Sequence, residues 1–101
     1  MSERDSARMT TGGWVVGVLV APAGEALQRH YYAVGHPDQA KAEWTAVDWA
    51  VRVGEVATSP VAGAEPVEAL RPLTLARMAT LGLAGGEVRE LGWRYPRRWL
   101  G

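Results

Sequence analysis

The segment PDQAKAEWTAVDWAVRV, which runs from Pro37 to Val53, predicts a helix more clearly than any other part of the chain. Proline suits the first position of a helix, and Asp38 and Gln39 follow it as a first-turn acid and as part of a capping box. Gly54 comes directly after the segment and fits a C-terminal cap. The sequence therefore predicts one main helix with defined start and stop signals.

The predicted helix carries two tryptophans, Trp44 and Trp49, at the two edges of a broad apolar surface. At about 100° per residue their side chains point roughly 140° apart, so one core-facing stripe does not easily hold both. Alanines, among them Ala42 and Ala46, form the floor of this surface. In one interpretation the chain itself covers the helix on most sides. In the other, Trp49 with Ala42 and Ala46 binds a protein partner or a second copy of the chain, because tryptophan is a favoured anchor of interfaces.

A β-hairpin is predicted before the helix. Residues 13–21 form a nearly unbroken apolar run rich in valine, whose length and β-branching favour a strand buried on both faces. Pro22 and Gly24 then supply the residues of a turn. Residues 27–34 favour a second, half-exposed strand, which completes the hairpin.

The C-terminal half of the chain predicts shorter elements. In chain order, they are a short strand at 55–58, a strand or a helix at 67–70, a weak helix at 73–81 and a last strand at 87–91. The tail that follows is expected to be irregular or extended, because it contains Pro96.

Together these elements predict the α+β class. We expect a small antiparallel sheet, made of the hairpin and one or two further strands, packed on one main helix with a short second helix. The 101 residues suffice for one domain and are too few for two. We expect residues 12–101 to form this domain and residues 1–11 to be a disordered tail, because they are polar and lack the apolar stretch of a signal peptide.

The composition is that of a soluble globular protein. Eleven basic and eleven acidic residues balance, so no global field draws the chain to nucleic acid or to a membrane. The lack of cysteine excludes disulfides and cysteine-ligated metals, and no apolar run approaches the roughly 20 residues that span a bilayer. We expect a cytoplasmic protein without a membrane partner. The chain lacks Phe, Ile and Asn and has Lys41 as its only lysine, as expected for a GC-rich, bacterial coding sequence.

Patterns for catalysis and metal binding are weak. His30 and His36 would lie about 20 Å apart on extended chain, too far to share a metal ion. Ser59 has no nucleophile-elbow pattern around it. Glu43 lies inside the apolar surface of the helix, where it either reaches the rim and pairs with an arginine or remains buried as a proton donor or acceptor. We expect no metal, no cofactor and no catalytic residues; Glu43, His30 and Tyr32 would be the first suspects if a pocket joined them.

The C-terminal tail is the sharpest functional candidate. Three arginines are interleaved with three aromatic residues in the set Trp93, Arg94, Tyr95, Arg97, Arg98 and Trp99. Such side chains stack on bases and contact phosphates in proteins that bind single-stranded nucleic acid. The alternative is that the aromatic residues pack back onto the sheet. The sequence thus supports a non-catalytic protein-interaction or homodimerising module, with a nucleic-acid-binding module that uses the tail as the alternative.

Overall fold

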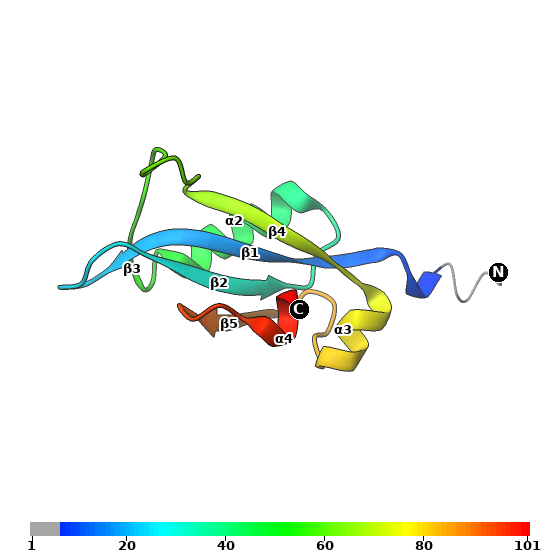
Figure 1. Cartoon of the computed structure of the whole chain (residues 1–101). Coiled ribbons are helices and arrows are strands. Elements are labelled where there is room, and N and C mark those ends of the chain that lie inside the picture. The colour runs from blue at the N-terminus through cyan, green and yellow to red at the C-terminus, as the bar shows by residue number, and fades with distance from the viewer. Residues whose placement is uncertain (1–6) are drawn as a thin grey trace.

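The computed structural model describes residues 7–101 as an antiparallel sheet of five strands with helices on both faces (Figure 1). The strands are β1 (Thr11–Pro22), β2 (Gln28–Val34), β3 (Gly54–Val56), β4 (Val67–Thr74) and β5 (Val88–Gly92). The helices are α2 (Gln39–Ala50), α3 (Leu75–Leu81) and α4 (Arg97–Leu100). The predicted α+β class, with one main helix and a short second helix, is confirmed.

The predicted hairpin forms the centre of the sheet. β1 and β2 pair antiparallel, from Trp14 opposite Val34 to Val20 opposite Gln28. Gly24 has a φ of +76° in the turn between the strands, a conformation that glycine adopts without steric cost. The turn chemistry read from the sequence therefore produces the hairpin.

Strand β1 also organises the other three strands. β5 pairs with the free edge of β2, while β3 and β4 share the free edge of β1. β4 lies opposite Thr11 to Val18, and β3 lies opposite the end of β1, from Val20 to Pro22. The sheet therefore has three strands beyond the hairpin, and residues 67–70, which fitted a strand or a helix, lie in β4.

Alternate side chains of β1 point into two separate cores, because successive residues of a strand face opposite sides of the sheet. The core under α2 contains Val16, Val18, Tyr32, Val34, Ala42, Ala46 and Ala50. The core under α3 and α4 contains Val15, Ala33, Leu73, Met78, Leu81, Leu83 and Trp99. Covering on both faces explains why the sequence of β1 is apolar without alternation.

Both predicted ends of the main helix need correction. Asp38 is the N-cap, because its carboxylate accepts the backbone N–H of Lys41 at 2.9 Å, so Pro37 precedes the cap and does not open the helix. Gly54 is not a helix cap; it is the first residue of β3. A side chain at Gly54 would collide with the backbone of Ala21 in the neighbouring strand, so glycine allows the two strands to approach.

The second helix is shorter than predicted, and only part of the tail is irregular. Thr74 caps α3 by accepting the N–H of Arg77, and Gly82 ends the helix with a φ of +75°. The expectation of an irregular tail is correct for residues 93–96, which form neither helix nor strand, and wrong for Arg97–Leu100, which forms α4. Pro96 occupies the N-cap of α4, outside the helix interior where a proline would cost a hydrogen bond.

The N-terminal tail predicted for residues 1–11 lies mostly outside the described residues. Within the described part, the N–H of Thr10 donates to the carbonyl of Ala7 at 3.1 Å. Thr11 already belongs to β1 and lies opposite Thr74 of β4. Among residues 7–101 no helix is both long enough and apolar enough to cross a membrane.

Candidate functional site

Of the three side chains suspected of catalysis, His30 and Tyr32 lie in β2 and Glu43 lies in α2. His30 Nε2 lies 3.0 Å from Gln28 Oε1 in β2, and half-buried Glu43 accepts a hydrogen bond from Gln39 one turn earlier in α2. Tyr32 is buried, and burial, followed by the nearby carboxylate of Glu90, raises its pKa to about 12. A tyrosine with this pKa stays protonated at neutral pH and is a poor general base.

The remaining histidine and the acidic residues of the described chain show no metal-ligating arrangement. His36 Nδ1 accepts the backbone N–H of Asp38 at 3.1 Å, which ties the histidine to the start of α2. Glu87 accepts hydrogen bonds from the N–H of Ala84 and from Arg89, and these two contacts lower the pKa of its carboxyl group. Within residues 7–101, no three His, Cys, Asp or Glu side chains come together in a way that could hold a metal ion.

The Trp49 edge of α2 is largely covered by the chain itself. Ala42 and Ala46 are fully buried against the sheet, because their small side chains let the helix approach β1 closely. Trp49 is half-buried against the same core, and the guanidinium carbon of Arg52 lies 4.8 Å from the centroid of its ring. The partner surface predicted around Trp49 therefore needs correction at Ala42 and Ala46, which are fully buried, while the prediction for half-buried Trp49 stays a prediction.

The opposite edge of α2 is exposed. Trp44 is 71% exposed and Val51 is 56% exposed, although both are large apolar side chains. With Val47 they form one stripe along the helix, at the spacing that places residues on a common face.

This stripe borders a groove of about 650 Å³ between α2 and the strands at the sheet edge. Val56 of β3, together with Pro66 and Val67 at the start of β4, lines the other side of the groove. The Trp44 groove is defined as the hollow between these two sets of side chains: Trp44, Val47, Val51, Val56, Pro66 and Val67. Its lining is mostly apolar, with Glu55 as the charged residue at its border.

The C-terminal tail divides into a buried part and an exposed part. Trp99 is only 6% exposed and belongs to the core under α3 and α4. Trp93 and Tyr95 are 58% and 59% exposed, and the guanidinium carbon of Arg94 lies 5.3 Å from the centroid of the Trp93 ring. The tail residues predicted to bind nucleic acid therefore remain available except for Trp99, while Arg97 and Arg98 are exposed on α4.

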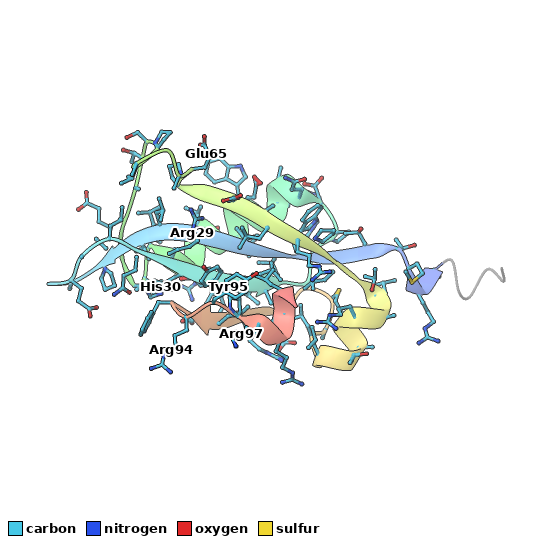
Figure 2. All side chains as sticks on the ribbon, in the orientation of Figure 1. Arg29, His30, Glu65, Arg94, Tyr95 and Arg97 are labelled. Carbon is cyan, nitrogen blue, oxygen red and sulfur yellow. The ribbon has the colours of Figure 1, made fainter. Side chains whose placement is uncertain are left out.

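Three distant parts of the chain meet beside Tyr95, on the face of the sheet opposite α2. Figure 2 labels two of the residues that line a cavity here, Arg29 and Tyr95. A cavity of about 430 Å³ is lined by Arg29 and Tyr31 from β2, Leu70 and Arg71 from β4, and Tyr95 and Leu100 from the C-terminal segment. We call it the arginine–tyrosine cavity. Sequence reasoning missed Arg29, Tyr31 and Arg71, because nothing in their local pattern links them to the tail.

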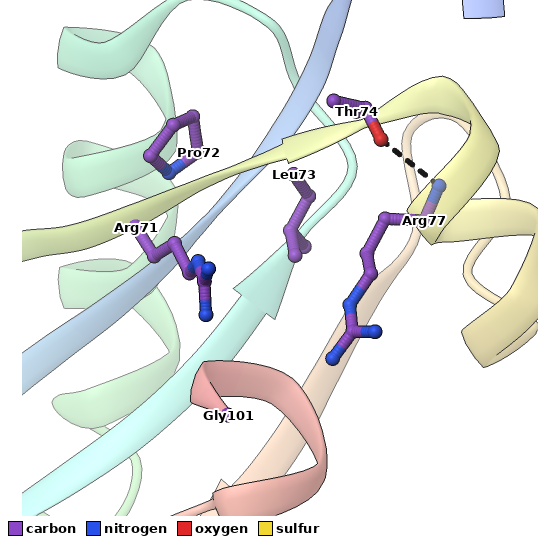
Figure 3. A pocket seen from close by; sticks show the side chains of 6 residues that line it. All are labelled: Arg71, Pro72, Leu73, Thr74, Arg77 and Gly101. Carbon is purple, nitrogen blue, oxygen red and sulfur yellow. Dashed lines mark hydrogen bonds between the residues drawn. The ribbon is translucent and has the colours of Figure 1, made fainter. Parts of the chain in front are cut away.

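Helix α4 is fastened to β4 and α3 by two arginines. Arg71 donates a hydrogen bond to the carbonyl of Leu100, and Arg77 Nη2 donates to the carbonyl of Arg98 at 2.8 Å. Such contacts satisfy carbonyl groups that the end of a helix leaves unpaired. A neighbouring hollow of about 340 Å³ lies between these two arginines and Gly101, and Figure 3 shows their guanidinium groups facing α4. This hollow is explained by the attachment of α4.

Comparison with known proteins adds no function to this geometry. No protein-family model matches the chain, and neither a curated protein nor a solved structure matches it. The Trp44 groove and the arginine–tyrosine cavity are the two candidate binding surfaces of the described residues.

Proposed function

We propose that the protein is a non-catalytic interaction module that forms a homodimer through the Trp44 groove. The observation that carries the proposal is the exposure of Trp44 and Val51, 71% and 56%, beside a groove with a mostly apolar lining. Burying apolar surface stabilises an interface by roughly 25 cal/mol for each Å² removed from water. Tryptophans in such positions are frequent hot spots of protein interfaces.

A second copy of the chain suits this groove for three physical reasons. An apolar stripe is complementary to itself, as a two-fold symmetric interface requires. The chain also has a formal net charge of zero at pH 7, so two copies approach without net repulsion. Moreover, β4 pairs only with β1 among the described residues, which leaves a strand edge next to the groove that a symmetric partner would cover.

The proposal is tested by the oligomeric state of the full chain. Sedimentation equilibrium from about 1 µM to about 1 mM should show a monomer–dimer equilibrium for the natural sequence. Trp44→Ala should weaken dimerisation by about 30-fold or more, the effect of removing an interface hot spot. Because Trp44 is exposed in the monomer, the variant should keep its fold.

Trp93→Ala is the matched control, since Trp93 is also a highly exposed tryptophan but lies in the C-terminal tail. It should dimerise like the natural sequence. A natural chain that stays monomeric at the highest concentration overturns the proposal. A dimer that tolerates Trp44→Ala overturns the assignment of the interface.

A further inference from the structure

We propose that the arginine–tyrosine cavity and the exposed tail beside it bind single-stranded nucleic acid. In this arrangement Tyr95 and Trp93 stack on bases, while Arg29, Arg71 and Arg94 contact the phosphates. The proposal does not depend on the Trp44 groove, which lies on the α2 side of the sheet.

Arg29 supplies a fixed positive charge at the cavity wall. Its Nη2 donates to the carbonyl of Glu65 at 3.3 Å, but its buried Nη1 has no hydrogen-bond partner among the described residues. The nearest carboxylate oxygen paired with it, on Glu68, is 3.8 Å away, beyond normal hydrogen-bond length. Gly17 lies under this side chain, where an added Cβ would come within 2.9 Å of Arg29 Cδ. An anionic group entering the cavity would therefore meet a guanidinium held in place.

Arg71 brings a second guanidinium to the same cavity. One of its nitrogen atoms donates to the carbonyl of Leu100, and a guanidinium has five N–H donors in total. Arg71 is exposed, so donors remain for a ligand. Two arginines converging on one hollow suit phosphate oxygens, which accept several hydrogen bonds at once.

The aromatic side chains at the cavity provide stacking surfaces. The ring of Tyr31 meets that of Tyr95 edge-on, with centroids 6.2 Å apart and an interplanar angle of 83°. This contact orients Tyr95 while 59% of the residue stays exposed. Trp93 offers a second exposed ring two residues away, with Arg94 over it. Two stacking surfaces suit successive bases of a strand, whereas a single nucleotide would use one.

The charge distribution also favours a polyanion. The chain as a whole is neutral, yet residues 92–101 contain three arginines and no acidic residue. Positive charge is therefore concentrated next to exposed aromatic rings. In proteins that bind single strands, positive side chains contact the phosphate backbone and aromatic rings stack on the bases. Glu90, the acid closest in sequence, lies opposite Tyr32 of the α2-side core, and its charge acts on that tyrosine.

The test is fluorescence anisotropy of labelled single-stranded DNA and RNA oligonucleotides titrated with the full chain. If the protein neutralises about three or four phosphates, the logarithm of the binding constant should fall with the logarithm of the salt concentration, with a slope of about −0.7 for each phosphate. The affinity should therefore fall roughly 20- to 50-fold between about 50 and about 200 mM salt. Tyr95→Ala should weaken binding about tenfold or more through lost stacking. Arg94→Ala should also weaken it and make the salt slope shallower by about 0.7.

Arg52→Ala is the matched control for Arg94→Ala, because Arg52 likewise lies over a tryptophan, Trp49, but on the α2 side. It should bind like the natural chain. Tyr95 and Arg94 are exposed, so both variants should fold, which circular dichroism verifies. The proposal is overturned by absent binding at low salt, by salt-independent binding, or by equal losses in Arg52→Ala and Arg94→Ala. Competition by a mononucleotide as effective as an oligonucleotide would also overturn it.

Discussion

Tyr32 is the clearest example of a single residue whose environment changes its chemistry. The side chain is 1% exposed under α2, and its hydroxyl has no hydrogen-bond partner among the described residues. Burial favours the neutral phenol over the phenolate, and the negative charge of Glu90 acts in the same direction. The pKa of Tyr32 therefore rises from its ordinary value of 10.0 to about 12.

This shift predicts a loss of stability at alkaline pH. Between about pH 10 and about pH 12 the unfolded chain has released the Tyr32 proton while the folded chain still holds it, so the free energy of unfolding falls as pH rises. The expected slope is up to about 1.4 kcal/mol per pH unit, measured by urea unfolding at several pH values. The contribution of Tyr32 is fully retained below pH 10.

Tyr32→Phe is the control for this prediction. It keeps the ring and removes the hydroxyl, so its unfolding free energy should fall less steeply above pH 10. At neutral pH the variant should be as stable as the natural chain or up to about 1 kcal/mol more stable, because an unpaired buried hydroxyl is gone. Equal slopes for both proteins would show that another group titrates.

Among the elements, α4 combines structural and surface roles within a few residues. Its Trp99 fills the core between the sheet and α3, and the guanidinium carbon of Arg89 lies 5.8 Å from the centroid of the ring. Arg71 and Arg77 hold the backbone of the helix. Trp93 precedes α4 and is 58% exposed. Trp99 thus contributes to a packed core, whereas Trp93 lies largely in solvent.

The difference predicts unequal costs of truncation. Trp99→Ala should lower the free energy of unfolding by about 3–5 kcal/mol, because it removes a large side chain from a packed core. Trp93→Ala should change it by less than about 0.5 kcal/mol, as expected for an exposed residue. Both values come from chemical denaturation. Similar costs for the two variants would contradict the placement of Trp99 in the core.

At the scale of the whole molecule, β1 joins the two cores. It is paired on both edges between Trp14 and Val18, and its side chains enter the cores on both faces. Loss of either core would expose this strand, so the two halves should unfold together.

The central position of β1 predicts the pattern of amide exchange. The amides of Val15, Val16 and Val18 should exchange with solvent only through global unfolding, because these residues are completely buried. Amides of the short strand β3 should open at lower free energy. Hydrogen exchange followed by NMR checks this order, and faster exchange in β1 than in β3 would disprove it.

Much of the fold follows from patterns between neighbours in the sequence. The hairpin was predicted from the valine run and the Pro22–Gly24 turn, and the main helix from the amphipathic segment after Pro37. These predictions succeed because hydrophobic period and turn chemistry are local properties of the sequence. The end of the tail was mispredicted for the same reason. Pro96 indicates extended chain locally, whereas burial of Trp99 and hydrogen bonds from distant arginines stabilise α4.

The candidate sites depend on contacts between residues that are far apart in the sequence, so their spacing in the sequence does not predict them. The helical periodicity placed Trp44 and Trp49 at the two edges of the apolar surface of α2. From the sequence alone, both edges are equally apolar. Packing against the sheet partly covers Trp49 and leaves Trp44 exposed beside the strands at the sheet edge. Likewise, Arg29 and Tyr95 meet only when β2 and the tail fold together. Helical and strand periods are determined by neighbouring residues in the sequence, whereas the exposure of a side chain is determined by residues distant in the chain. For this reason only the tertiary structure decides which edge of α2 stays exposed.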